Sequence, residues 1–136
     1  MKALDTNIIA RFFVDDPDDP QAAKQRPAAI AAMKQRVFVS VTVLLELEWV
    51  MRGFYELPRK DIHRALSALC GYDNVLIEDR HAVLAALAAY KQGLDFADAL
   101  HLMRASRCQA LVTFDQRLIK RVAALGLSPV CEVPSG

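Results

Sequence analysis

The sequence has few cysteines, no long apolar run and no excess of one charge. Its three cysteines, Cys70, Cys108 and Cys131, stand at wide spacings rather than in paired metal-ligand motifs, so we expect buried, reduced thiols. No run of about 18 apolar residues exists, which excludes a transmembrane helix. The N-terminus reaches Asp5 after two apolar residues and offers no signal-peptide core. We therefore expect a soluble cytoplasmic protein.

Charge and length set two further limits. Lys and Arg number 17 against 16 for Asp and Glu, so any contact with nucleic acid must come from local basic patches. With 136 residues, 54% of them apolar, the chain suits one compact domain over residues 1–136 that buries roughly two-thirds of its unfolded surface. No internal repeat, low-complexity tract or linker suggests a second domain.

Short apolar segments rich in β-formers alternate with helical patterns. The expected strands are residues 2–4, 36–41, 74–77 and 110–114, and the expected helices are residues 7–14, 20–34, 42–55, 59–70, 80–92, 96–107 and 116–125. Pro27 is the exception, because a proline inside the second helix should kink or split it. Strands separated by helices predict an α/β fold of three layers, α/β/α, around a central parallel sheet of four to five strands.

Asp5 and Asp115 each follow an apolar strand and precede a helix. Both should therefore lie at the carboxyl ends of parallel strands, the edge where open α/β sheets bind ligands. The alternative for each residue is a helix N-cap, a position that aspartate fills well. Taken singly, each aspartate fits the N-cap better than a binding role.

Glu46 lies on a mostly apolar helix face, since its neighbours three and four positions away are mainly Val43, Trp49 and Val50. A carboxylate there needs a partner. Glu48 precedes Arg52 by four residues, and a surface ion pair of about 0.3 to 0.5 kcal/mol explains it without any function. We therefore select Glu46 and expect Glu48 on the surface, where it could still support the site.

Asp95, Asp98 and His101 form one polar stripe at spacings of three residues. Asp95 resembles an N-cap, and an acid at Asp98 also favours the helix dipole, so a structural role is a serious alternative. We expect His101 to be a hydrogen-bonded neighbour rather than a metal ligand, because sites ligated by oxygen rarely need imidazole.

A cluster of such carboxylates needs a cation. Two carboxylates about 4 Å apart repel by roughly 4 kcal/mol at an effective dielectric of 20. Oxygen ligands favour Mg²⁺ or Mn²⁺ over zinc, and such a site can bind a phosphate oxygen while activating a water for in-line attack. The residues alone thus point toward a metal-dependent nuclease.

Four fragments in this order and spacing resemble the PIN-domain family, and most closely its bacterial VapC-type toxins. They are Leu4-Asp5-Thr6-Asn7, residues 43–50 around Glu46, residues 95–101 around Asp98, and Thr113-Phe114-Asp115. The resemblance spans nearly the whole chain.

The resemblance implies an endoribonuclease that depends on Mg²⁺ or Mn²⁺, with Asp5, Glu46, Asp98 and Asp115 matching the family's acidic quartet as catalytic metal ligands. Thr6, Asn7 and Thr113 lie beside those positions and would orient ligands or water. VapC-type proteins are typically neutralised by a small antitoxin and usually dimerise, so we expect an RNA substrate, an antitoxin partner, a homodimer and no membrane.

Candidate RNA contacts are cations near these acids, although an ordinary solvated helix face explains any single one of them better. They are Arg11, Arg104, Arg107, Arg117, Lys120 and Arg121.

Other functions fit the sequence less well. An aspartyl phosphatase needs a second aspartate where Asn7 stands, and a phospho-accepting receiver needs a lysine after a late strand, which the C-terminus lacks. A silent PIN-like module that binds RNA or protein would have no use for a destabilising acidic cluster. A housekeeping RNA-processing nuclease of the same fold stays open, separable by an adjacent antitoxin reading frame and by growth arrest on expression.

Overall fold

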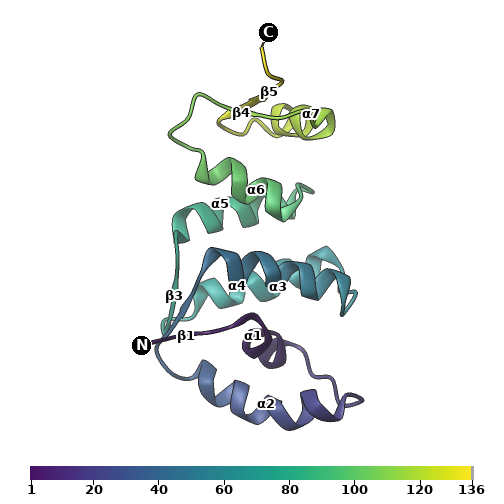
Figure 1. Ribbon diagram of the computed structural model, residues 1–136, viewed down its shortest axis with the longest axis vertical. Coiled ribbons are helices and arrows are strands. Elements are labelled where there is room, and N and C mark those ends of the chain that lie inside the picture. The colour runs from purple at the N-terminus through teal and green to yellow at the C-terminus, as the bar shows by residue number, and fades with distance from the viewer. Residues whose placement is uncertain (136) are drawn as a thin grey trace. The chain divides into compact units, whose positions relative to one another are not determined.

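The computed structural model describes residues 1–135 as seven helices and five short strands (Figure 1). In chain order they are β1 Lys2–Ala3, α1 Thr6–Phe13, α2 Pro20–Met33, β2 Val37–Val39, α3 Val41–Gly53, α4 Arg59–Gly71, β3 Val75–Ile77, α5 Arg80–Lys91, α6 Phe96–Arg104, β4 Ala110–Val112, α7 Gln116–Leu125 and β5 Val130–Glu132. They form two compact units, Met1–Arg80 and His81–Gly136.

The first unit contains a parallel sheet in the order β1-β2-β3. Lys2 pairs with Val37, and Val37 pairs in turn with Val75, so β2 is the central strand. Helices connect the strands because parallel neighbours need a crossover. α1 packs against α2 and α3, and α3 packs against α4 (Figure 1). The carboxyl ends of all three strands therefore lie at one edge, where Asp5 and the N-terminus of α3 begin.

The second unit contains β4 and β5, which pair in parallel across the crossover helix α7. Leu111 is opposite Cys131 in this register. Helix α7 ends at Gly126, whose φ of 65° is the left-handed conformation that glycine adopts readily at this position. In the preceding helices, the rings of Tyr90 and Phe96 meet edge to face with centroids 5.5 Å apart.

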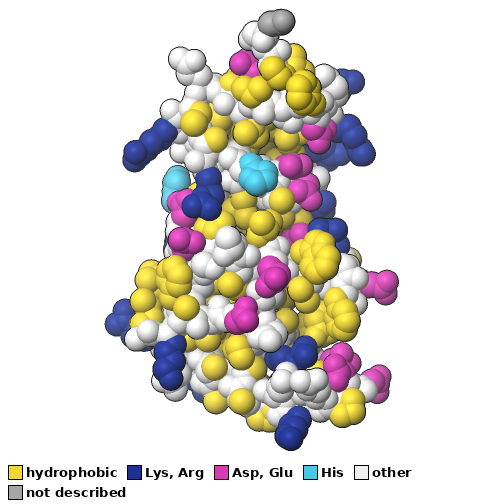
Figure 2. All heavy atoms as spheres, in the orientation of Figure 1, with side chains coloured by type: hydrophobic (Ala, Val, Ile, Leu, Met, Phe, Trp, Pro, Cys, Tyr) yellow, Lys and Arg dark blue, Asp and Glu magenta, His cyan; other side chains and the backbone are white. Residues whose placement is uncertain are grey.

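Both units bury large apolar side chains completely. Leu44, Leu47 and Met51 on α3 are 0% exposed, at the spacing of three and four residues that gives a helix one apolar face. Burial of each such side chain contributes about 1.5 to 3 kcal/mol to the stability of the folded state. Charged side chains of both signs are interspersed on the face shown in Figure 2, in keeping with the near-zero net charge.

The predicted α/β class with parallel strands is confirmed, and each of the seven predicted helices exists. The strands are distributed three and two between the units, and β5 was not predicted. That strand has three residues between Pro129 and Pro134, too few to show an alternating pattern. Helix α6 ends at Arg104 rather than at residue 107. No glycine or proline follows Arg104 to mark this end in the sequence, so the predicted helix was too long.

Two local expectations were wrong. Pro27 does not split α2, which runs unbroken from Pro20 to Met33. Pro27 and Ala23, the residue whose carbonyl loses its helical partner, are both exposed, so water can bond to that carbonyl. Cys108 is exposed in the turns after α6, whereas Cys70 and Cys131 are buried as expected, and burial raises the pKa of both thiols.

Among residues 1–135, no helix is long and apolar enough to cross a membrane.

Candidate active site

Asp5 stands where β1 ends and α1 begins, and it is the N-cap of α1. Its Oδ1 accepts a hydrogen bond of 2.7 Å from the backbone N–H of Thr6. Thr6 itself is only 5% exposed. The strand end therefore fixes Asp5, and the first turn of α1 fixes Thr6 beside it.

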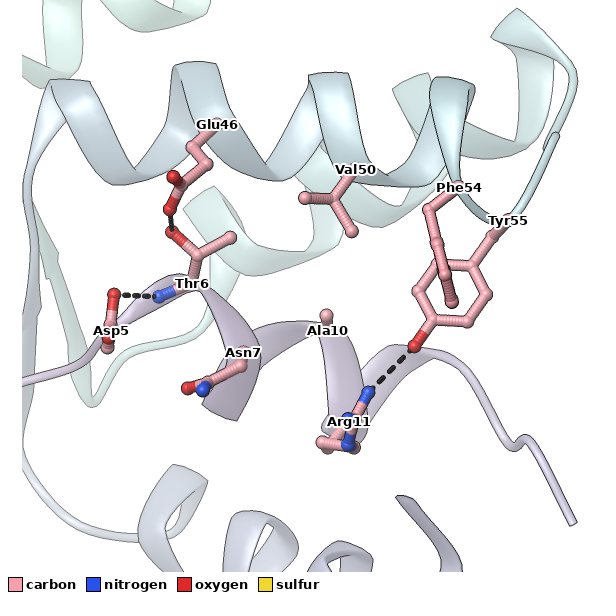
Figure 3. Close-up of a pocket in the computed structure, with 9 residues that line it drawn as sticks. All are labelled: Asp5, Thr6, Asn7, Ala10, Arg11, Glu46, Val50, Phe54 and Tyr55. Atoms are coloured by element: carbon pink, nitrogen blue, oxygen red, sulfur yellow. Dashed lines mark hydrogen bonds between the residues drawn. The ribbon is translucent and has the colours of Figure 1, made fainter. Parts of the chain in front are cut away.

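Glu46 reaches the same place from α3. The Thr6 hydroxyl donates a hydrogen bond to Glu46 Oε1, as Figure 3 shows. Asp5, Thr6 and Glu46 together line a pocket of about 210 Å³. Each carboxylate uses one oxygen in these bonds, which leaves Oδ2 of Asp5 and Oε2 of Glu46 for a cation.

The other end of this pocket is lined by apolar and aromatic side chains together with one arginine. These residues are Ala10, Val50, Phe54, Tyr55 and Arg11, and Asn7 lies near the acidic end (Figure 3). Arg11 donates from Nη1 to the Tyr55 hydroxyl at 2.8 Å and from Nε to Gln25 Oε1 at 3.1 Å. Two hydrogen bonds, one to Gln25 on α2 and one to Tyr55 after α3, thus fix the guanidinium.

The expected surface position of Glu48 on α3 was wrong. Glu48 is buried, at 3% exposure, and receives two bonds from Arg52, at 2.9 and 3.3 Å. Glu46 is exposed, on a face that also presents Trp49 at 62% exposure. The pairing of Glu48 with Arg52 was predicted correctly, but the buried side of the helix was not.

In the second unit, Asp98 lies in the first turn of α6, where its backbone N–H donates to Asp95 Oδ2 at 3.1 Å. Partial burial raises the pKa of Asp98, and the negative charges of Asp95 and Asp115 raise it further. The charge of His101 acts in the opposite direction and lowers the pKa of Asp98. Asp98 and Asp115 are thus close enough to repel, as expected of residues that share a cation.

Asp115 is the N-cap of α7 and accepts a bond of 3.0 Å from the backbone N–H of Leu118. The Thr113 hydroxyl accepts a bond of 3.0 Å from the backbone N–H of Asp115. Thr113 therefore stabilises the turn that presents this carboxylate, just as Thr6 stabilises Glu46.

The candidate RNA-binding cations fall in separate places. Arg117, Lys120 and Arg121 line a pocket of about 380 Å³ along α7, floored by Ala124 and Leu125. Arg121 also donates to the Gly93 carbonyl at 3.4 Å. Arg104 is in the last turn of α6, and Arg107 lies beyond its end.

The predicted acidic residues form two pairs, Asp5 with Glu46 in the first unit and Asp98 with Asp115 in the second. Within either unit, the described residues contain no group of three His, Cys, Asp or Glu side chains that could hold a metal ion. Each unit therefore supplies a pair and not a complete set of ligands.

Comparison with known proteins identifies the family. A family model for the PIN domain matches residues 2–125. The chain belongs to the PIN domain family. It is also similar to a VapC ribonuclease of Aquifex aeolicus (strain VF5), with 23% identity over 124 residues, which cover 88% of this chain and 91% of that protein.

The stretch that matches the PIN domain includes all four predicted carboxylates and crosses from the first unit into the second. The family resemblance inferred from the four sequence fragments is therefore confirmed. The roles of the individual residues stay predictions.

Sequence reasoning missed three residues of this PIN domain. Phe54 and Tyr55 line the pocket, and Glu78 accepts a bond of 2.8 Å from the Val41 backbone N–H at the start of α3. An aromatic pair just after a helix, or an acid just after a strand, is too common to single out. Only the folded chain brings these residues to the carboxyl edge of the sheet or to the pocket.

Proposed function

We propose that this PIN domain is an endoribonuclease that depends on a divalent metal ion, and that it is the toxin of a VapBC-type toxin–antitoxin pair. The observation that carries the proposal is the pairing of Asp5 and Glu46 at one pocket through Thr6. The Asp98 and Asp115 pair supports it, and so does the similarity to a protein named a VapC ribonuclease.

The donor atoms fit Mg²⁺ or Mn²⁺. We propose Asp5, Glu46, Asp98 and Asp115 as the metal ligands, because carboxylate oxygens are what these hard cations prefer. Burial raises the pKa of Asp98 most, and the negative charges of Asp95 and Asp115, which a cation would offset, raise it further. A bound divalent ion supplies charge neutralisation at the phosphate and a water of lowered pKa for hydrolysis.

The protein's own residues position this chemistry. Thr6 holds one oxygen of Glu46, and the Asp5 and Asp115 carboxylates are fixed by backbone N–H groups at the starts of α1 and α7. Asn7, in the pocket, and Thr113, at the Asp115 turn, would orient ligands or water. We expect attack by water to leave 5′-phosphate and 3′-hydroxyl ends.

Basic side chains would hold the RNA backbone. Arg11 in the first pocket and Arg117, Lys120 and Arg121 along α7 are candidates, as are Arg104 and Arg107. Each phosphate contact should add to the salt dependence of binding.

The remaining expectations concern assembly. We propose that residues 1–136 act as one nuclease domain, since the family match crosses both units. We further propose a cytoplasmic homodimer that a small antitoxin neutralises.

The test is cleavage of total cellular RNA by the purified protein in Mg²⁺ or Mn²⁺, with new 5′ ends mapped by sequencing. The controls are EDTA and the Asp98→Asn variant. We expect discrete cuts that both controls abolish. RNA left intact under every condition would contradict the nuclease and favour a binding module of the same fold.

A further inference from the structure

The pocket beside Asp5 and Glu46 changes character along its length. Glu46 and Val50 on α3, and Phe54 at its C-cap, follow one another at intervals of four residues and so lie on one side of the helix. From Glu46 to Phe54 the helix rises roughly 12 Å. The pocket thus extends along this side of the helix from a carboxylate to an aromatic ring.

Phe54 is 68% exposed, whereas the aliphatic residues of the pocket, Ala10 and Val50, are buried and half-buried. Its ring and that of Tyr55 form a T-shaped pair, with centroids 4.9 Å apart and planes at 88°. The Tyr55 ring, drawn beside Phe54 in Figure 3, thus supports the phenyl group, while much of the phenyl surface is exposed. A single exposed apolar residue needs no explanation, but an exposed aromatic ring in a pocket that also holds a carboxylate and a guanidinium suggests a stacking surface.

Arg11 gives this end of the pocket a positive charge. Its Nε and Nη1 are already bonded to Gln25 and Tyr55, while Nη2 has no hydrogen bond to any residue from 1 to 135. A guanidinium fixed in this way loses little freedom when it binds an anion. Without a bound cation, the acidic end of the pocket would repel a phosphate, whereas the Arg11 end attracts one.

We propose that Phe54 and Arg11 form a subsite for one unpaired RNA base next to the cleaved phosphodiester. The base stacks on Phe54, and Arg11 binds the phosphate of the same nucleotide. Proteins that read single-stranded RNA combine aromatic stacking with cationic contacts in this way. This inference rests on the proposed function and adds a position at which the enzyme selects its cleavage site.

Binding in EDTA tests the subsite without cleavage. The full-length protein is titrated into a short fluorescein-labelled single-stranded RNA of mixed sequence, and anisotropy gives the Kd. We expect Phe54→Ala and Phe54→Leu to raise the Kd about tenfold, and Phe54→Trp to restore it, because stacking needs an aromatic face. Arg11→Gln should lower the salt slope of log K by about 0.7, whereas the Phe54 variants leave that slope unchanged.

The matched control is Trp49→Ala, which removes an exposed aromatic from the same helix outside the pocket. Equal binding by the Phe54→Ala and Trp49→Ala variants would overturn the subsite. So would a Phe54→Leu variant that binds like the parent, because an apolar contact without stacking would then suffice. The comparison of Leu with Trp holds even if the Ala variant fails to fold.

The cleavage assay separates the two proposals. If RNA binding depends on Phe54 but no RNA is cut in Mg²⁺ or Mn²⁺, the nuclease fails and the base subsite stands. If discrete cuts occur and Phe54→Ala changes neither binding nor the choice of sites, the subsite alone fails.

Discussion

At the scale of single residues, two glutamates separated by one position on α3 have opposite environments. Residues two apart on an α-helix point about 200° apart, so Glu46 and Glu48 cannot share a face. Glu46 is exposed and bonded to Thr6, while Glu48 is buried and bonded to Arg52. The two carboxylates therefore affect different properties, Glu46 the pocket and Glu48 the stability of the fold.

Removing Arg52 should destabilise the protein. Arg52→Ala leaves the buried Glu48 carboxylate without its two charged hydrogen bonds, at a cost on the order of 1 to 3 kcal/mol. The matched control is Arg64→Ala, whose partner Asp61 lies 3.7 Å away in an exposed pair, and that change should cost less than about 0.5 kcal/mol. Urea denaturation of both variants measures the difference, and equal losses would contradict the buried role of Glu48.

Asp98 should reduce stability in the absence of metal. Its pKa is raised by burial first and then by Asp95 and Asp115, so the folded state binds its proton more tightly than the unfolded state. Its contribution to stability is therefore present below the unfolded pKa of about 3.9 and is lost as pH rises through the folded pKa. Asp98→Asn should thus gain stability relative to the parent as pH rises from about 4 to 7.

Chemical denaturation in EDTA across this pH range measures that gain, and added Mn²⁺ completes the test. Mn²⁺ should raise the melting temperature of the parent and not that of Asp98→Asn, because a ligand that binds only the folded state stabilises it. A variant that is less stable than the parent at every pH would instead show that the carboxylate serves the first turn of α6.

Residue patterns selected candidate acids but did not predict the surroundings of every acid. α3 carries apolar residues on two faces, one with Leu44, Leu47 and Met51 and one with Val50 and Phe54. Spacing alone cannot tell which face the rest of the unit covers. That choice depends on tertiary packing, so the burial of Glu48 was not predicted.

At the scale of elements, the N-cap and the ligand prove to be compatible roles. Asp5, Asp95 and Asp115 each cap a helix, as the alternative explanation for these residues expected. A cap uses one carboxylate oxygen and fixes the side chain at the helix start. The other oxygen stays available, so capping prepares a carboxylate for a cation rather than excluding one.

Two substitutions at Asp115 separate the cap from the charge. Asp115→Ala should cost about 1 kcal/mol of stability, because α7 loses the bond from the Leu118 N–H. Asp115→Asn should stay close to the parent, since asparagine caps helices as well as aspartate does. Thermal denaturation in EDTA measures both variants. Equal losses would show that the negative charge, and not the cap, stabilises this turn.

The elements themselves were largely predictable. Proline at the start of α2 and apolar periodicity located the helices to within a few residues. β5 was not predicted because its three residues form a strand by pairing with β4. That pairing joins segments separated by α7 and leaves no local sequence signal. Long-range pairing of short strands is where local sequence reasoning fails.

At the scale of the whole molecule, the functional residues are spread over almost the entire chain. Asp5 and Glu46 belong to one compact unit and Asp98 and Asp115 to the other, while the PIN domain match covers both. Net charge indicated no function, and the order of four acidic fragments indicated the family. The proposed base subsite depends on Phe54, a side chain that no motif marks.

The most direct test is cleavage of total RNA by Asp115→Asn in Mn²⁺, beside the parent, with melting temperatures measured in EDTA. This variant keeps the α7 cap and removes one negative charge from the proposed metal ligands. We predict an unchanged melting temperature in EDTA together with loss of the discrete cuts. Parental cutting by a folded Asp115→Asn protein would mean that Asp115 is a helix cap only, and would contradict the four-carboxylate site.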